Sequence, residues 1–494
     1  MATPLVVFVH GWSVHHTRTY GGLPARLQQA AEAEGLPIDV AHLYLGEYIS
    51  FRDEVRVADI AHAFDAALRA VLRAAGRQRA VCITHSTGGP VVREWLARFH
   101  AGAAARSPIS HLVMLAPANF GSALAQLGKA RVGRLKAAFA GVEPGQRVLD
   151  WLELGSTDAW RLNHDGIHRA DAPARGPWAF VLCGDAIDRK LYDHVNPYTG
   201  ETGSDGVVRL AAANLNASHL VLRQPPAPSG VSMAEARKQL QSLSVVSTAR
   251  AAPTAFKILP GLAHSGTRIG IMGSVGARAD HPTVTAVMRC LRVRDARSYA
   301  ALTRAFEAEN ATHQAEANRL EVERVPVLPD RHHIHDPCTQ LMLRVRDDHG
   351  AVVDDVDVLL TRPGARGADR MPRGFLVDRQ ANRRGSGVLT FYLNHAVLAG
   401  AGPVVDDGGV VIRPALAGFG PYGLSVTPRH PDDAVTYCAA ALSPDNGNLL
   451  PHLRPNETTL VDVVLTRVVR EGVFRLRRSL KARSFKADPP GGVA

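Results

Sequence analysis

Ser86 is the residue of this chain whose setting points most directly to chemistry. Residues 81–89 read VCITHSTGG. An apolar stretch leads to Ser86, and small residues lie near the serine on both sides. A serine held in such a sharp turn has a strained backbone, so the residues two before and two after it must be small. Gly88 meets this condition, and Thr84 stands where glycine is commoner. The pattern predicts a nucleophile elbow, and therefore covalent catalysis through the Ser86 hydroxyl.

The residues after Ser86 predict a helix that begins directly behind it. Pro90 fits the first turn of this helix. Its apolar face follows the helical period and consists of Val92, Trp95, Leu96 and Phe99. The positive end of the helix dipole would face an oxyanion that forms at Ser86, as acyl transfer requires.

A second oxyanion donor is predicted near the N-terminus. Residues 5–12, LVVFVHGW, read as a buried strand that runs into a His-Gly turn. We assign one oxyanion amide to Gly11 or Trp12 and the other to Thr87, directly after the nucleophile. The alternative is an ordinary strand-to-loop glycine, but its place before the Ser86 strand and helix favours the catalytic interpretation.

Two aspartates follow strand-like segments and are candidates for the catalytic acid. Asp185 comes just after AFVLC at residues 179–183, and Asp205 lies in GSDGVV at residues 203–208. We favour Asp205, because an Asp-Gly pair before an apolar run gives a tight turn whose carboxylate can reach across to an imidazole. Asp185 would then shape the end of its strand. The alternative for either residue is a plain Asx turn.

The candidate base is His264, in the loop after a late strand. It lies in AFKILPGLAHSG at residues 255–266. His219 and His281 are rivals, because the chain holds 22 histidines and a chance candidate is easy to find. The alternative for His264 is a solvated loop residue.

The three preferred residues occur in the order Ser86, Asp205, His264. In the predicted mechanism His264 accepts the serine proton, the aspartate fixes the imidazole tautomer, and two backbone amides hold the tetrahedral oxyanion.

Several motifs together resemble the α/β-hydrolase lipases and esterases over residues 6 to about 291. They are His10-Gly11, THSTGG at residues 84–89, LAPANFGS at 115–122, SDGVV at 204–208 and the late His264. The LAPANFGS run is similar to the segment that introduces the lid region of many lipases and of the GPI-inositol-deacylase-like branch. The resemblance implies a doubly wound α/β-hydrolase sheet with helical cap insertions and a serine hydrolase acting on carboxylic esters. It is less specific for the substrate, since this fold hosts many activities.

Element patterns divide the chain into two predicted domains. Strands and helices alternate up to about residue 118, and we expect residues 1–325 to form the α/β-hydrolase catalytic domain. Helix-like segments within about 119–175 predict a cap over the acyl site; the alternative is that they are packing insertions. Residues 223–252 read as an extended loop plus a short helix and receive no role.

Residues 326–494 change to short β-like segments separated by Gly, Pro and Asp turns. The partial period-two alternation predicts an all-β sandwich of roughly six to eight strands. Its expected role is either a module for lipid, a partner or a secretion apparatus, or a structural shield for the hydrolase. Its C-terminal tail is basic, with Arg470, Arg475, Arg477, Arg478, Lys481, Arg483 and Lys486 among apolar residues. Such a tail could lie on an anionic membrane surface, although a solvated tail is the better interpretation.

Composition fits a large globular protein, with 494 residues, 46% hydrophobic and 21% charged. No apolar stretch is long enough to cross a bilayer, and no secretory signal precedes the first strand. The five cysteines are scattered and read as reduced core residues, so we expect synthesis in a cytoplasm and any export without a cleaved signal. The net charge of +11 favours anionic partners, but no reader motif supports nucleic-acid binding.

The histidine-rich run RHHIHD at residues 331–336 invites a metal interpretation. Zinc sites usually need ligands that converge from separate elements, and no Cys-x-x-Cys or His-Glu-x-x-His spacing is present. A polar linker is the better interpretation. No phosphate-binding glycine loop is present either, so the sequence predicts neither a metal nor another cofactor.

The function predicted from these observations is hydrolysis of carboxylic esters of lipids or phospholipids through an acyl-enzyme intermediate. One alternative is a small-ester, thioester or polyester hydrolase, and another is a non-catalytic hydrolase-fold binding protein that works through its sandwich. A further resemblance, to type VI secretion phospholipase effectors, implies export to a target cell and a secretion-apparatus or immunity partner; a cytoplasmic housekeeping esterase is the alternative.

Overall fold

The computed structural model describes most of the chain. The described residues are 3–10, 19–47, 49, 52–103, 106–128, 145–169, 177–187, 201–227, 233–276, 280–317, 320–323, 331–362, 371–382, 386–406, 408–418, 420, 422–429, 435–443 and 447–469. Among them, no helix combines the length and the apolar character needed to cross a membrane.

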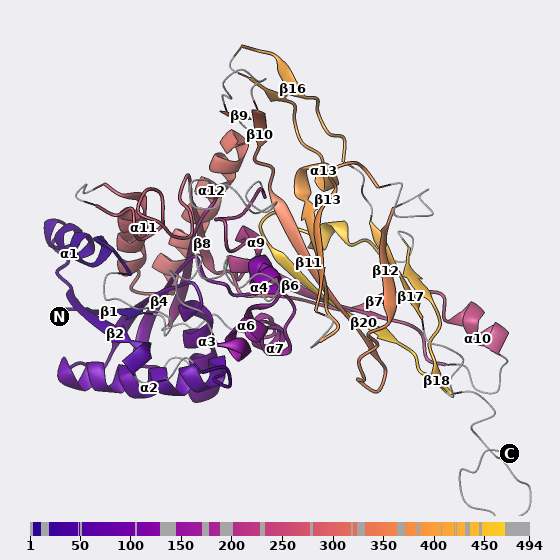
Figure 1. The fold of residues 1–494 in the computed structure, drawn as a ribbon, viewed down its shortest axis with the longest axis horizontal. Coiled ribbons are helices and arrows are strands. Elements are labelled where there is room, and N and C mark those ends of the chain that lie inside the picture. Colours follow the sequence, from indigo (N-terminus) through magenta and orange to yellow (C-terminus); the bar gives the residue numbers. More distant parts are fainter. Residues whose placement is uncertain are drawn as a thin grey trace, which may run out of the picture.

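A six-stranded parallel sheet forms the centre of the N-terminal lobe, drawn from indigo to magenta in Figure 1. In spatial order its strands are β2 (Asp39–Tyr44), β1 (Leu5–His10), β3 (Ala80–His85), β4 (Ile109–Leu115), β5 (Trp178–Gly184) and β8 (Ala255–Leu259). The strand order reverses between β1 and β3, and such a switch point opens a crevice at the carboxyl ends of the strands. This sheet confirms the predicted doubly wound α/β fold.

Helices cover both faces of this sheet (Figure 1). One pair consists of α1 (Leu23–Ala33) and α11 (Pro282–Leu291), and the other of α2 (Val57–Ala74) and α3 (Gly88–Phe99). The long helix α12 (Ala296–Ala317) packs against the edge strand β8. The helices cover the central strands β1, β3, β4 and β5 on both sides, and these strands are nearly continuous apolar runs, whereas the edge strand β2 is partly exposed.

Among the described residues of the region predicted as a cap, three segments form helices. They are α4 (Ala123–Gly128), α6 (Gln146–Leu152) and α7 (Thr157–Ile167). The α6 helix packs against α2, and α7 packs against α3 and the strand β6. These contacts fix the helices on the side of the lobe that faces the C-terminal lobe, and a covering role over the acyl site stays a prediction.

A second six-stranded sheet joins segments from both halves of the chain. In spatial order its strands are β13 (Leu376–Ala381), β14 (Leu389–Asn394), β11 (Cys338–Asp347), β20 (Thr458–Leu465), β6 (Ala217–Arg223) and β7 (Ser244–Arg250). The segment expected to be an extended loop with a short helix is therefore the end of β6, the helix α10 (Met233–Gln239) and β7. The predicted short helix is present, but the predicted loop missed the strand β7, which pairs antiparallel with β6. The pairing of β6 with β20 joins residues far apart in the sequence, so no local pattern indicates this sheet.

The C-terminal lobe has a second layer that completes a sandwich. A three-stranded sheet of β12 (Val356–Thr361), β17 (Gly423–Pro428) and β19 (Ala440–Leu442) shares an apolar core with the six-stranded sheet. Other short elements of the chain are β9 (Leu320–Glu323), β10 (Arg331–Ile334), β15 (Val404–Val405), β16 (Val411–Arg413), β18 (Val435–Thr436), β21 (Val468–Val469), α9 (Leu210–Ala213) and α13 (His395–Ala399). The predicted β-rich domain after the hydrolase is confirmed.

Three other features predicted from the sequence are the histidine-rich run, the basic tail and the reduced cysteines. The RHHIHD run, expected as a polar linker, begins with the strand β10, which pairs with β9. The basic segment after residue 469 lies outside the described residues. All five cysteines are buried thiols, as predicted.

Candidate active site

The serine elbow joins β3 to α3 and has the strained backbone that its sequence predicts. Ser86 has a φ of 53°, which non-glycine residues rarely adopt. Its N–H donates to the carbonyl oxygen of Leu115 at 3.0 Å and so ties the turn to the neighbouring strand β4. A β-carbon on Gly88 would stand 3.3 Å from the Thr84 β-carbon. Thr84 is therefore tolerated because residue 88 is glycine.

The structure brings Ser86, His264 and Asp205 together. His264 Nε2 lies 3.1 Å from Ser86 Oγ, and His264 Nδ1 lies 2.9 Å from Asp205 Oδ2. Both distances are within hydrogen-bond reach. His264 is 2% and Asp205 1% exposed, so water does not compete for the bond between them.

Asp205 is held by the turn that follows it. Its Oδ1 accepts the N–H groups of Val207 at 3.0 Å and Val208 at 2.7 Å. The Cys183 thiol donates to Oδ2 at 3.6 Å, and burial together with the negative Asp205 raises the pKa of that thiol. In addition, the backbone N–H of His264 donates to the backbone carbonyl oxygen of Asp205 at 2.9 Å. The carboxylate is thus oriented toward the imidazole before any substrate binds.

The alternative acid, Asp185, has other partners. Its Oδ1 accepts the Gly261 N–H at 2.8 Å, and its Oδ2 accepts a hydrogen bond from His313 Nε2 at 2.6 Å. Asp185 therefore joins the end of β5 to the loop after β8 and to α12. This is the strand-end role that we gave it as the alternative to catalysis.

The two rival histidines lie in other hydrogen-bond networks. His219, on β6, contacts His168 at 2.9 Å and Asp462 at 2.9 Å. His281 caps the N-terminus of α11, and its Nε2 lies 3.0 Å from Ser274 Oγ.

The oxyanion donors are only partly described. Gly11 and Trp12 lie outside the described residues. Thr87 is the N-terminal cap of α3, and within the described part of the chain its N–H reaches no backbone acceptor. His10, just before the undescribed segment, is buried, with its ring 4.3 Å from that of Tyr44 and its Nε2 2.9 Å from His42 Nδ1. These contacts fix the end of β1 against β2, and β3, which leads to the elbow, pairs with the other side of β1.

His85, directly before the nucleophile, is a second imidazole at the site that the sequence did not single out. Its Nε2 lies 3.0 Å from the His264 carbonyl oxygen, so this nitrogen carries the proton and donates. The two rings are 4.7 Å apart, and burial, reinforced by the neighbouring His264, lowers the pKa of His85 to about 3. His85 is therefore a neutral donor that steadies the loop of the base.

A buried arginine connects the Asp205 turn to the C-terminal lobe. Arg209 pairs with Glu201 at 2.6 Å and with Asp378 on β13 at 2.5 Å, and it stacks 4.1 Å from the Tyr392 ring. The Tyr392 hydroxyl on β14 donates to the carbonyl oxygen of Gly203 at 3.0 Å. The second sheet thus braces the loop that carries the candidate acid, a role that no local pattern could reveal.

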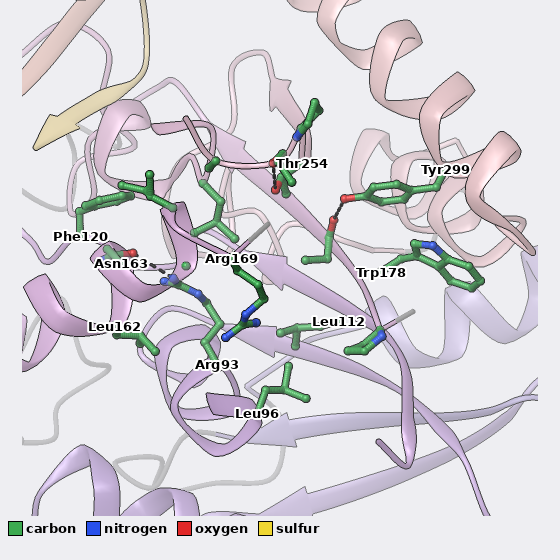
Figure 2. Close-up of a pocket in the computed structure, with 18 residues that line it drawn as sticks. Arg93, Leu96, Leu112, Phe120, Leu162, Asn163, Arg169, Trp178, Thr254 and Tyr299 are labelled. Atoms are coloured by element: carbon green, nitrogen blue, oxygen red, sulfur yellow. Dashed lines mark hydrogen bonds between the residues drawn. The ribbon is translucent and has the colours of Figure 1, made fainter. Parts of the chain in front are cut away.

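A cavity of about 200 Å³ lies elsewhere in the N-terminal lobe (Figure 2). Trp178 and Ala179, at the start of β5, line it together with Leu162 on α7. Arg93 hydrogen-bonds Asn163 at 2.9 Å there, and burial together with the nearby Arg169 lowers the pKa of Arg93 to about 9. The cavity adjoins the amino end of β5, whereas Ser86 follows a carboxyl strand end, so it is separate from the candidate active site.

Comparisons with known proteins place this geometry in a family. No protein-family model matches the chain, and no curated protein matches it in sequence. Among solved structures, phospholipase PlaB from Legionella pneumophila is 40% identical with a TM-score of 0.82, covering 100% of this chain and 99% of its own. The same phospholipase in complex with thio-NAD is 38% identical with a TM-score of 0.81, covering 99% of each chain.

The similarity extends over both lobes, including the mixed second sheet. A sequence identity of 40% over the whole chain indicates common family membership and not a shared fold alone. The predicted resemblance to α/β-hydrolase lipases and esterases is confirmed. The chain belongs to the family of the Legionella phospholipase PlaB.

Proposed function

We propose that this protein is a serine hydrolase that cleaves the carboxylic ester bonds of phospholipids. The observation that carries the proposal is the hydrogen-bond chain from Ser86 Oγ through His264 to Asp205, with distances of 3.1 and 2.9 Å. Such a chain on a strained elbow is the arrangement that activates a serine for acyl transfer. Family membership with a phospholipase favours a phospholipid as the ester.

In the acylation step Ser86 Oγ attacks the ester carbonyl carbon. Its proton passes to His264 Nε2, and the carbonyl oxygen becomes an oxyanion. Collapse of this intermediate breaks the bond to the lysolipid oxygen, which takes the proton from His264 and leaves as an alcohol. The acyl chain stays on Ser86 as an ester.

Water completes the cycle in the deacylation step. His264 removes a proton from a water molecule, whose oxygen attacks the acyl carbon, and the second intermediate breaks the bond to Ser86 Oγ. The serine recovers its proton from His264, and the fatty acid leaves. Asp205 acts throughout as the acceptor of the Nδ1–H, which keeps the lone pair of Nε2 directed at the serine.

The oxyanion needs two donors, for which we propose Thr87 and Gly11 or Trp12. The Thr87 N–H belongs to the first turn behind the nucleophile, where the α3 dipole adds positive potential. The segment of Gly11 and Trp12 follows β1, which is adjacent to β3 in the sheet.

A matched set of hydrolysis assays tests the function. Wild type and Ser86→Ala are compared on phospholipid vesicles and on a soluble acyl ester. We expect the variant to lose on the order of 10³-fold or more in kcat on both substrates. Ser247→Ala is the control, because Ser247 is exposed on the edge strand β7. Hydrolysis of the soluble ester alone would replace the phospholipase by the small-ester alternative.

A fluorophosphonate probe distinguishes the non-catalytic alternative. An activated serine reacts covalently with such a probe, whereas a hydrolase-fold binding protein would not. We expect labelling of wild type and Ser247→Ala, and none of Ser86→Ala. Absence of labelling in all three would favour a binding protein that works through the sandwich.

Export and partner contacts are a separate part of the proposal. The resemblance to secreted phospholipase effectors predicts that the chain directed to the periplasm harms a bacterial cell, and that Ser86→Ala does not. Equal growth of both strains would favour a cytoplasmic esterase. Membrane contact through the basic tail predicts weaker vesicle binding when the tail is removed and when the salt concentration is raised.

A further inference from the structure

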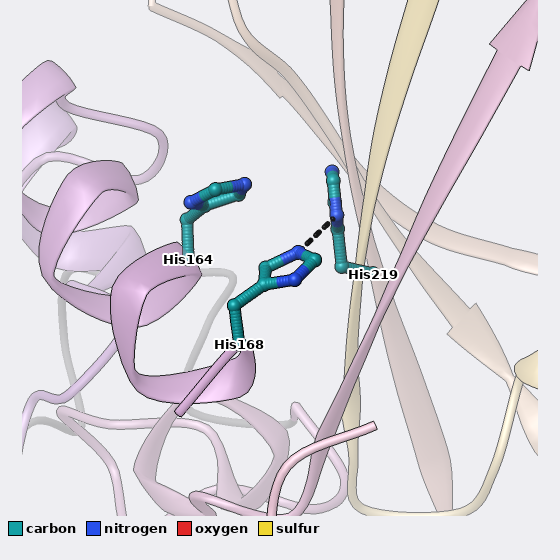
Figure 3. A group of neighbouring side chains, drawn as sticks. All are labelled: His164, His168 and His219. Carbon is teal, nitrogen blue, oxygen red and sulfur yellow. Dashed lines mark hydrogen bonds between the residues drawn. The ribbon is translucent and has the colours of Figure 1, made fainter. Parts of the chain in front are cut away.

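Three histidines meet where the helix α7 packs against the second sheet (Figure 3). His164 lies in the last turn of α7, and His168, four residues later, is the C-terminal cap with a helical backbone conformation, so the two side chains lie on the same side of the helix end. His219 stands opposite them on β6. The three side chains each offer a ring nitrogen, and these nitrogens all lie within 4.8 Å of one another.

A carboxylate fixes the orientation of the deepest ring. His219 is buried, and its Nε2 lies 2.9 Å from Asp462 Oδ2 on β20. A carboxylate accepts, so this nitrogen carries the proton, and the lone pair of Nδ1 is directed at His168. Metal-binding histidines are held in this way by an outer carboxylate, which fixes both the tautomer and the ring plane.

A hydrogen bond between two of the histidines takes the place that a metal ion would occupy. His168 Nε2 donates to His219 Nδ1 across 2.9 Å. Two imidazole nitrogens on one tetrahedral zinc ion, each about 2.0–2.1 Å from it, are about 3.3 Å apart. Exchange of the shared proton for the ion therefore needs a separation of the two rings by a few tenths of an ångström. His164 closes the set, with its ring 4.5 Å from that of His168 and 4.8 Å from that of His219.

We propose that His164, His168 and His219 form a transition-metal site, best suited to Zn²⁺. Three imidazoles select Zn²⁺ or a similar ion over Mg²⁺ and Ca²⁺, which prefer oxygen ligands. His168 is exposed, so the ion has a path from solvent and a water molecule can take the fourth position.

The site would act as a structural link between the lobes. It joins α7, in the cap region, to β6, and through Asp462 to β20 in the centre of the second sheet. The residues of the candidate active site lie on other elements, so the ion does not take part in ester hydrolysis. Bound metal would stabilise the folded state in proportion to the logarithm of its free concentration.

Metal titration of the whole protein tests the site. The chain is treated with a chelator and titrated with Co²⁺, whose visible absorption reports tetrahedral coordination, and then with Zn²⁺ in competition. We expect one equivalent of tight binding and a rise in Tm with Zn²⁺. His164→Ala and His168→Ala should each weaken binding about 10-fold or more, because loss of even an outer partner of a ligand costs on the order of 10- to 100-fold. Both side chains have solvent access, so their truncation leaves the fold intact.

The controls separate this site from adventitious binding, since the chain holds 22 histidines. His349→Ala, at an exposed turn, should bind metal as wild type does. Thermal unfolding without metal should be unchanged in His164→Ala and His349→Ala, and slightly lower in His168→Ala, which also loses the hydrogen bond to His219. Equal Co²⁺ spectra in wild type and in both α7 variants would overturn the proposal, as would the lack of saturable binding at one equivalent.

Discussion

At the residue scale, the strained backbone of Ser86 depends on close packing between Thr84 and Gly88. Its positive φ costs about 1–3 kcal/mol and persists only where the surroundings hold it. Thr84 is fully buried in β3, and its β-carbon leaves only 3.3 Å for a β-carbon at residue 88. The space between residues 84 and 88 therefore accommodates a side chain at only one of these two positions.

We expect Gly88→Ala to lower ester hydrolysis by about tenfold or more, equivalent to a cost of about 1–3 kcal/mol. Thr84→Gly combined with Gly88→Ala should recover most of the lost activity, because the clashing side chain is gone. Gly402→Ala is the control, since a β-carbon there meets nothing within 4 Å. Equal damage in the single and double variants would contradict this steric explanation.

A second prediction at the residue scale concerns the neutral His85 and acid stability. Burial lowers the pKa of His85 to about 3, against about 6.5 in an unfolded chain. Between these values the unfolded state binds more protons, so the free energy of unfolding rises with pH across this window and is lost on acidification. His111, whose pKa burial lowers to about 4, acts in the same direction.

We expect His85→Gln to reduce the stability lost between about pH 6.5 and about pH 4 by roughly 1–3 kcal/mol. Glutamine does not titrate, and its amide can still donate to the His264 carbonyl oxygen. Urea unfolding at both pH values measures the effect, with the exposed His349→Gln as the control. An unchanged pH dependence would show that His85 is already accessible to protons in the folded state.

At the scale of elements, strands of the C-terminal lobe hold the turn of the candidate acid. The β14 hydroxyl of Tyr392 donates to the carbonyl oxygens of Thr202 and Gly203, both at 3.0 Å. The β13 carboxylate of Asp378 pairs with Arg209 at the other end of the same turn. The sandwich is therefore part of the support of the candidate active site, which favours the structural interpretation of that domain.

Tyr392→Phe removes these hydrogen bonds and keeps the ring under Arg209. We expect kcat to fall several-fold with little change in KM, since the turn positions Asp205 without touching the lipid. The loss of buried hydrogen bonds should also lower stability by about 1 kcal/mol. Tyr437→Phe, which removes a hydrogen bond to Asp347 in the same lobe, is the matched control. An equal fall of kcat in both variants would point to a general loss of stability.

At the scale of the whole molecule, the two lobes share one sheet. The strand β6, in pink tones, lies beside the yellow β20 in the C-terminal lobe, and β7 pairs with the other side of β6 at the edge of the sheet (Figure 1). Side chains also cross between the lobes, with Thr458 Oγ1 donating to the Ala211 carbonyl oxygen at 2.7 Å and Asn214 Nδ2 to that of Asn456 at 2.8 Å. A cut after residue 325 would remove β20 and so leave β6 paired only with β7.

We therefore expect residues 1–325 alone to aggregate or to lack ester hydrolysis. The cut would leave the backbone of β6 unpaired on the side of β20 and would uncover the apolar side chains of Leu220 and Leu222, which the sandwich buries in the full chain. The full chain should unfold in one cooperative transition, measured by calorimetry together with probes of each lobe. An active, monomeric fragment 1–325 would mean that the hydrolase lobe folds independently of the second sheet.

The sequence by itself determined the local parts of this protein. The elbow at Ser86, the apolar face of α3, the strand runs and the order of serine, aspartate and histidine depend on sterics and periodicity over a few residues, and these act within a segment. The sequence also indicated the change to β structure after the hydrolase, because alternation with turn residues is likewise a local pattern.

Only the tertiary structure decided which distant residues meet. It brought Asp205 rather than Asp185 to His264, since the turn after Asp205 points its carboxylate inward while α12 occupies Asp185. It also paired β6 with β20 and gathered His164, His168 and His219. Strand register and packing between segments set these contacts, and the free energy that selects them comes from burial across the whole chain, which no short run of residues contains.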